Sequence, residues 1–171
     1  GNVREEESKE AEIQWKVSAY LPPEYIPVES QRVMLYKRVA EARTPEELDD
    51  LAAEVKDRYG DVVREAPGGE GKMNEELPEP VDNLFLIARM RMLARRLDIR
   101  KVIGMKSGFK LQKDNILTQL GSRAQKAVGS SADIYADDPD ALEFGYKDWT
   151  KRRGLNEAVS VLEKLGKVKA K

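Results

Sequence analysis

The sequence predicts an α+β fold in which a helical hairpin and further helices pack on a small, mainly antiparallel sheet. Segments with helical periodicity and segments with strand alternation are mixed along the chain without a regular strand–helix–strand rhythm. The strand-like segments are also short and separated by turn residues, which is typical of antiparallel hairpins. The 171 residues suffice for one domain with a core, so we expect residues 11–171 to form a single domain.

The first ten residues, "GNVREEESKE", are polar and acidic, and we expect a disordered lead or a remnant of the expressed fragment. A half-buried strand is predicted next, because apolar residues alternate with polar ones at Ile13, Trp15, Val17 and Ala19. The following segment must run extended, since neither a helix nor a regular ladder accommodates Pro22, Pro23 and Pro27.

Two helices follow. The first opens at Glu29 or Ser30, and the second lies in "TPEELDDLAAEVKDRYG". Thr44 is its expected N-cap, Glu47 completes a capping box and Gly60 is the expected C-terminal cap. About two residues join these helices, so they should pack as an antiparallel hairpin.

The remaining segments complete the mixed pattern. Residues of about 64–78 are rich in Gly, Pro and Glu and predict a flexible insert. A third helix is expected from Pro80 to Leu97, and then a β-hairpin turning at Ser107–Gly108. The last predicted elements are a helix at 115–128, the strands "DIYAD" and "ALEFGY", and a final helix ending near Gly166.

Composition excludes several classes of function. The chain has no Cys and no His, which removes thiol nucleophiles, disulfides, Ser-His triads and His/Cys zinc sites. An enzyme would depend on carboxylates, Lys, Tyr or Ser, and no such constellation is present, so we expect no catalytic residue, metal site or cofactor in this fragment. No run of eighteen apolar residues occurs, and a cytoplasmic protein is the expectation. The net charge of −1 gives no overall field that attracts nucleic acid.

Two motifs resemble ligand sites and fail on their spacing. "GGEGK" at 68–72 has Ala66 where a phosphate-binding loop needs Gly, and Met73 where it needs Ser or Thr. The acidic residues between Asp133 and Glu143 do not follow the spacing of a calcium-binding loop, and Pro139 marks an ordinary turn. We interpret the first as a flexible loop and the second as a turn.

The predicted third helix is rich in arginine: Arg89, Arg91, Arg95 and Arg96. One interpretation is a stripe that contacts phosphates, which would make the chain a nucleic-acid-binding module. The other is a solvated face with partners inside the chain. The second is favoured because the arginines spread around the helix and no aromatic residue lies among them to stack on bases.

The predicted second helix carries acidic residues at spacings of three and four, which places them on one face: Glu47, Asp50, Glu54 and Asp57. Like charges so placed repel by a few tenths of a kcal/mol per pair. A solvated face is one interpretation, with Lys56 and Arg58 offsetting part of the repulsion. The other is an interface for Arg or Lys of a partner, because carboxylates bind guanidinium groups through two hydrogen bonds.

Residues 21–60, "LPPEYIPVESQRVMLYKRVAEARTPEELDDLAAEVKDRYG", and 78–102, "PEPVDNLFLIARMRMLARRLDIRKV", resemble the C-terminal (TRCF) domain of the bacterial transcription-repair coupling factor, Mfd. The resemblance extends over about residues 13–113. Several spaced blocks carry it, which makes it specific. The insert near 65–77 departs from the family pattern.

The resemblance implies a parent that is an ATP-driven DNA translocase, with ATP and Mg in its motor. Such a parent displaces stalled RNA polymerase and recruits UvrA in nucleotide-excision repair. The C-terminal domain is then a regulatory domain that folds back on the N-terminal UvrB-like module, masks UvrA binding and restrains the motor. The acidic residues of this contact match Glu54 and Asp57 here.

Overall fold

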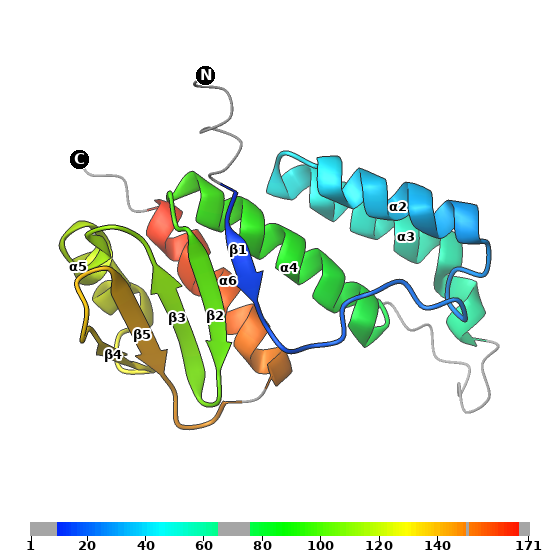
Figure 1. Ribbon diagram of the computed structural model, residues 1–171. Helices are drawn as coiled ribbons and strands as arrows, with labels where there is room; N and C mark the ends of the chain where they lie inside the picture. Colours follow the sequence, from blue (N-terminus) through cyan, green and yellow to red (C-terminus); the bar gives the residue numbers. More distant parts are fainter. Residues whose placement is uncertain (1–9, 65–75, 150, 168–171) are drawn as a thin grey trace, which may run out of the picture. The chain divides into compact units, whose positions relative to one another are not determined.

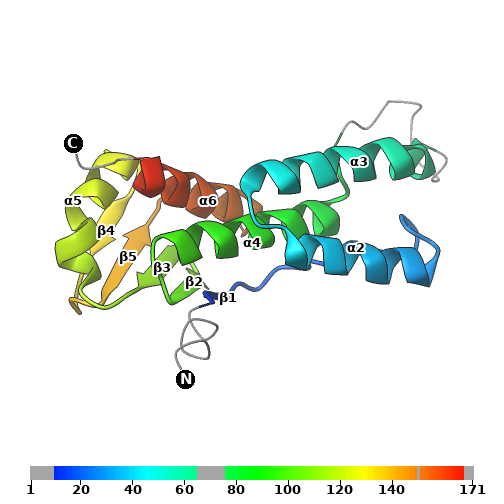
Figure 2. The same cartoon turned by 90° about the horizontal axis from the view of Figure 1, so that it is seen from above.

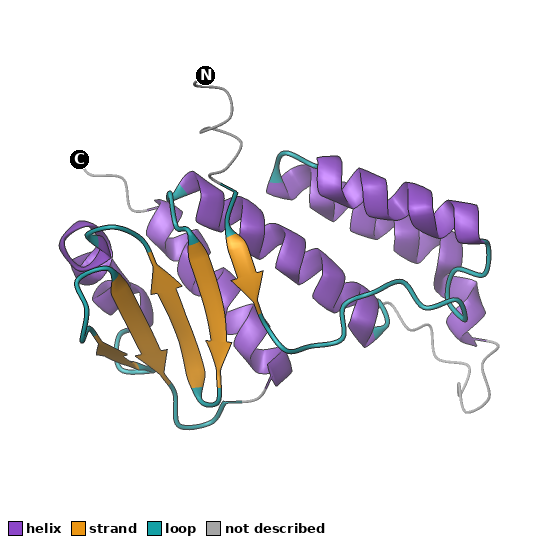
Figure 3. Cartoon of the chain, in the orientation of Figure 1, coloured by secondary structure: helices purple, strands orange, loops and turns teal. Residues whose placement is uncertain are grey.

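The computed structural model describes residues 10–64, 76–149 and 151–167, and it confirms the α+β class (Figures 1 and 3). The lead at 1–10 and the insert at 64–78 that the sequence predicts fall largely outside the described residues. In chain order the elements are β1 (Glu12–Gln14), α2 (Glu29–Glu41), α3 (Pro45–Arg64), α4 (Glu79–Arg96), β2 (Lys101–Met105), β3 (Gly108–Gln112), α5 (Ile116–Val128), β4 (Asp133–Tyr135), β5 (Ala141–Gly145) and α6 (Lys151–Lys167).

The chain divides into two compact units. The sheet unit comprises Gly1–Lys16 and Met90–Lys171, and the helical unit comprises Val17–Arg89. The division falls within α4, between Arg89 and Met90. No helix in the described part of the chain is both long and apolar enough to cross a membrane.

The sheet has five strands in the order β1-β2-β3-β5-β4. β1 pairs with β2 in parallel, and the other three pairs are antiparallel. The sheet is therefore mainly antiparallel, as the sequence predicts. Cross-strand partners such as Val102–Leu111 and Leu111–Leu142 are fully buried. They form the inner face, against which α5 and α6 pack, while the strands in Figure 1 present their other face openly.

Aromatic rings fill one end of the sheet unit. Phe109 and Phe144 stack with ring centroids 4.5 Å apart, and Tyr146 stacks on Trp149 at 4.9 Å. A Cβ added to Gly104 would lie 2.6 Å from the Trp15 ring. Glycine is therefore needed at that position because the indole lies directly on the backbone.

The helical unit is built on the predicted hairpin of α2 and α3, which Figure 2 shows from above. The Tyr59 hydroxyl donates to Gln31 Oε1 at 2.9 Å, joining the start of α2 to the end of α3 and confirming the antiparallel arrangement. Between the helices, apolar side chains are buried at the spacing of an amphipathic helix: Leu35, Val39, Leu48, Leu51 and Val55.

The proline-rich segment before α2 is anchored by its backbone. The N–H groups of Tyr25 and Ile26 both donate to the Pro22 carbonyl at 3.0 Å, and Leu21 N–H donates to the Tyr36 hydroxyl at 2.8 Å. Tyr25 itself is buried, and its hydroxyl lies 3.4 Å from the Val55 carbonyl oxygen. Burial, with a smaller contribution from neighbouring Tyr59, raises the pKa of Tyr25 to about 12.

Three sequence-based boundaries need correction. Gly60 is not a C-terminal cap, because α3 continues through it to Arg64. The β2–β3 hairpin turns at Lys106–Ser107, since Gly108 already pairs with Met105. The first strand ends at Gln14, where its pairing with β2 ends, although exposure continues to alternate as far as Ala19.

Candidate functional site: an acidic surface on the helical hairpin

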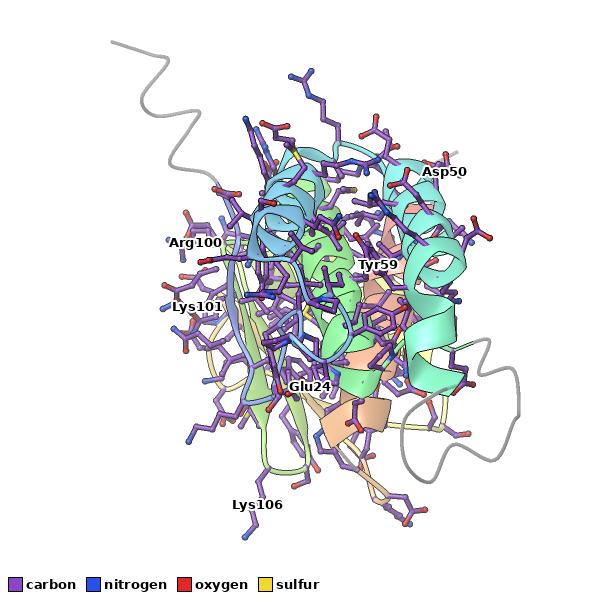
Figure 4. All side chains as sticks on the ribbon, turned by 90° about the vertical axis from the view of Figure 1, so that its right-hand side faces the viewer. Glu24, Asp50, Tyr59, Arg100, Lys101 and Lys106 are labelled. Carbon is purple, nitrogen blue, oxygen red and sulfur yellow. The ribbon has the colours of Figure 1, made fainter. Side chains whose placement is uncertain are left out.

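The four acidic residues predicted to form an interface all lie exposed on α3: Glu47, Asp50, Glu54 and Asp57. The buried residues Leu48, Leu51 and Val55 define the inner side of the same helix. The spacing thus gives an acidic stripe beside an apolar one, and Figure 4 shows Asp50 on α3. The structure places the four side chains on this surface, and their role as an interface stays a prediction.

Glu47 has a local structural role. Its carboxylate accepts a hydrogen bond from the Arg43 N–H at 2.8 Å, while the Thr44 hydroxyl accepts one from the Glu47 N–H at 3.2 Å. The Thr44 bond is the N-cap half of the capping box that the sequence predicts, whereas Glu47 reaches one residue further back than that motif requires, to Arg43 instead of Thr44. Together these two bonds fix the residue at which α3 begins, and with it the side of the helix on which the acidic stripe lies.

Glu54 is held by an arginine of the neighbouring helix. Arg38 Nη1 donates to Oε2 of Glu54, and Arg38 Nη2 donates to Oε1 at 3.1 Å. The hydrogen bonds and charge of Arg38, with a smaller effect of Arg58, hold the pKa of the Glu54 carboxyl below its usual range. Both side chains remain about half exposed, at 46% for Arg38 and 48% for Glu54.

Asp50 and Asp57 differ from Glu54. Within the described ranges of the chain, neither carboxylate forms a hydrogen bond or an ion pair. Among the described residues, they are therefore the members of the stripe that neither accept a hydrogen bond nor form an ion pair.

A hollow of about 340 Å³ opens beside the stripe, at the end of α2 and the start of α3. Its rim is acidic and also includes Arg38, and Ala42 and Leu51 add apolar surface; the acidic members are Glu41, Glu47, Asp50 and Glu54. A second hollow of about 250 Å³ lies along the same helix pair and includes Met34, Val55 and Arg58.

The contribution of Arg38 was not predicted from the sequence, although "YKR" lies within the resembling segment. Sixteen positions separate Arg38 from Glu54, so helical spacing alone does not relate them. A usable signal existed, because an antiparallel hairpin brings the last turns of α2 beside the first half of α3.

The arginine-rich helix is α4. Arg89 forms an ion pair with Asp49 of α3 and approaches the Pro45 carbonyl at 3.4 Å, so its guanidinium is engaged within the helical unit. Arg91 is half-buried in the sheet unit, and Arg95 and Arg96 are exposed. Nucleic-acid binding through this helix stays a prediction. Because Arg89 is already engaged, the phosphate contacts would have to come from the other arginines of the helix.

The other acidic stretch forms a hydrogen-bonded turn. The Asp138 carboxylate accepts from the Asp140 N–H, and that of Asp140 accepts from the Asn115 N–H, both at 2.8 Å. No group of three or more side chains that could bind a metal ion lies together in residues 10–64, 76–149 and 151–167. The "GGEGK" loop lies outside the described residues.

The class of molecule defined so far is a small α+β domain in which a capped helical hairpin carries an acidic surface. Comparison with known proteins shows what this chain is similar to. Residues 15–67 match the TRCF domain. The chain is 34% identical over 101 residues to the transcription-repair-coupling factor of Escherichia coli (strain K12), covering 59% of this chain and 8% of that protein.

Two further relatives carry the same name. One from Mycobacterium bovis is 35% identical over 97 residues, covering 57% of this chain and 7% of the relative. One from Bacillus subtilis (strain 168) is 31% identical over 96 residues, covering 56% and 7%. The chain thus spans less than a tenth of the length of these relatives.

A solved structure shares the fold. The crystal structure of the C-terminal domain of transcription-repair coupling factor superposes with a TM-score of 0.71, at 20% identity and 91% coverage of both chains. The resemblance seen in the sequence is therefore confirmed: residues 15–67 match the TRCF domain, the curated relatives are transcription-repair-coupling factors, and the chain has the fold of the C-terminal domain of such a protein.

Proposed function

We propose that this domain is the autoinhibitory interaction domain of its parent, a transcription-repair coupling factor. It docks through the acidic stripe of α3 on the N-terminal UvrB-like module and masks the surface that binds UvrA. Docking also restrains the ATP-dependent translocase that moves on DNA and displaces stalled RNA polymerase in nucleotide-excision repair. The observation that supports this most directly is the exposure of Asp50 and Asp57 on the face of α3 that also carries Glu54, without a neutralising partner among the described residues.

The physical basis is a difference in contacts between two states of the parent. Contacts that exist only in the docked state favour that state, and coupling of this kind is typically about 1–3 kcal/mol. Carboxylate–guanidinium pairs that lose part of their water on docking supply energies of this size. Polymerase or DNA binding elsewhere on the parent then overcomes the coupling.

The capped hairpin suits this role because it presents the carboxylates from a rigid element. Thr44 and Glu47 fix the helix start, and three apolar residues anchor its inner face, Leu48, Leu51 and Val55. A preorganised surface loses little side-chain and backbone entropy on docking, which favours a specific contact over a diffuse electrostatic attraction.

The experiment combines Glu54→Ala with Asp57→Ala in the full-length parent. We expect higher basal ATPase activity and tighter UvrA binding, because the closed state loses two carboxylates. The matched control combines Glu24→Ala with Glu79→Ala, which removes two exposed carboxylates of the helical unit outside α3. Wild-type behaviour of the Glu54 and Asp57 variant in both assays would exclude this face.

A further inference from the structure

The Arg38–Glu54 pair has the geometry that a docking partner would need. Two guanidinium nitrogens of Arg38 each donate to a different carboxylate oxygen of Glu54. This two-bond arrangement is the one through which an arginine of another module would bind a carboxylate most strongly. In the undocked domain, a residue of the chain itself therefore occupies that arrangement on Glu54.

The pair also lies where two hollows meet. Arg38 and Glu54 line both the 340 Å³ hollow and the 250 Å³ hollow beside α2 and α3. The first hollow is rimmed by Glu41, Glu47 and Asp50. A guanidinium that leaves Glu54 therefore has other carboxylates within the same hollow, and its release does not strand a charge away from water or from counter-charges.

Exchange of partners is favoured by the exposure of both side chains. Pairs of this kind contribute only about 0–1 kcal/mol, because water competes for both groups. The pair is strong enough to hold Glu54 in place and weak enough for a better-placed cation to replace Arg38.

We propose that Arg38 is an internal competitor for the docking surface: it occupies Glu54 in the undocked domain and is displaced to the acidic hollow when a partner arginine binds. This inference rests on the proposed function, because it assumes that Glu54 contacts a cation of another module. Asp50 and Asp57 make the first contact, and exchange at Glu54 completes docking.

The competitor also bears on selectivity. An ammonium group is a single point charge and does not reproduce the two parallel hydrogen bonds of a guanidinium. A partner lysine therefore displaces Arg38 less effectively than a partner arginine. The surface should prefer arginine-bearing modules over lysine-rich ones with the same net charge.

The test measures calorimetric binding of the 171-residue chain to the parent protein that lacks its own C-terminal domain. The Arg38→Gln chain should bind about two- to five-fold more tightly. An exposed ion pair contributes up to about 1 kcal/mol, and its removal changes an affinity by a factor of this size. Lys37→Gln is the control, because it removes the same charge from an adjacent, exposed position of α2. The control should change affinity by clearly less.

A double-mutant cycle separates displacement from a general charge effect. In a Glu54→Gln background, Arg38→Gln should give no further gain, because no carboxylate remains to be released. Weaker binding of Arg38→Gln, a gain matched by Lys37→Gln, or a gain that persists with Glu54→Gln would each overturn the proposal. Far-UV circular dichroism and urea unfolding confirm that every variant is folded.

Failure of the proposed function gives a different result. If Glu54→Gln with Asp57→Asn binds as tightly as the wild-type chain, the acidic stripe is not the docking surface. If that variant binds weakly and Arg38→Gln shows no gain, the stripe docks and only the competitor role of Arg38 is wrong.

Discussion

In the sheet unit, a cluster of aromatic rings that includes Phe109 and Phe144 fills one end, whereas the hairpin of the helical unit is marked by its capped helix start and the two-bond Arg38–Glu54 pair. Ion pairs occur in both units, as Arg100 with Asp114 shows for the sheet unit. The family model matches residues 15–67, which belong almost entirely to the helical unit. The solved structure, at 20% identity, agrees over 91% of the chain. Caps and ion pairs require particular residue types, whereas an apolar core tolerates many sequences of similar volume. The helical unit is therefore recognisable by its residues, and the sheet unit chiefly by its fold.

The largest expected effect tests how strictly backbone geometry constrains the sheet unit. A Cβ added by Gly108→Ala would lie 1.6 Å from the Phe144 carbonyl oxygen, and backbone in a ladder moves little. We expect a loss of about 3 kcal/mol or more in the free energy of unfolding, measured in urea. Gly60→Ala is the control in the helical unit, where the added Cβ meets nothing within 4 Å. It should be neutral or stabilise by up to about 1 kcal/mol. Equal effects of the two changes would remove the contrast.

A smaller loss is expected where a glycine faces a side chain instead of backbone. A Cβ at position 154 would lie 2.4 Å from the Trp149 ring, which is only half-buried and has room to shift. Gly154→Ala should destabilise the chain by about 1–2 kcal/mol and change its tryptophan fluorescence. A loss as large as that of Gly108→Ala would show that Trp149 is held as rigidly as the strands.

In the helical unit, the buried Tyr25 predicts an alkaline transition. Its pKa of about 12 when folded lies above the value of about 10 expected when unfolded. The folded chain thus holds this proton more tightly, and stability falls as pH rises from about 10 to 12. We expect a loss of about 1–2 kcal/mol over this range of pH. Tyr25→Phe should reduce this pH-dependent loss in urea unfolding. An unchanged pH profile would contradict the assignment.

The smallest expected effect on stability is that of the charged contact which carries the functional proposal. Glu54→Gln should change the free energy of unfolding by about 0.5 kcal/mol or less at neutral pH, because both members of the pair are exposed. The folded pKa of Glu54 is lowered, so its small contribution is present above the unfolded pKa and is lost as pH falls through the folded value. Urea unfolding at neutral and acidic pH measures it. A large loss at neutral pH would indicate a structural role instead of a docking role.

Much of the fold is readable from local patterns. The start of α3 follows from Thr44 and Pro45, and the β2–β3 hairpin follows from two short alternating strands around a turn. The parallel β1–β2 pair and the strand order β1-β2-β3-β5-β4 do not follow from local patterns. The predicted end of α3 at Gly60 was wrong, because a glycine near a helix end is compatible with both a cap and a continuing helix. In the site, helical spacing placed the four carboxylates on one face, but it did not show which of them would already be neutralised.

The sequence by itself determined the order and type of the elements, the resemblance to the TRCF domain and the acidic face of α3, because caps, periodicity and charge spacing act over a few residues. Only the tertiary structure decided that Arg38 occupies Glu54 and that Arg89 is engaged with Asp49. Those partners are 16 and 40 positions apart, so the packing of α2, α3 and α4 within the helical unit brings them together. The physical reason is that ion pairing depends on distance in space, which local sequence does not specify.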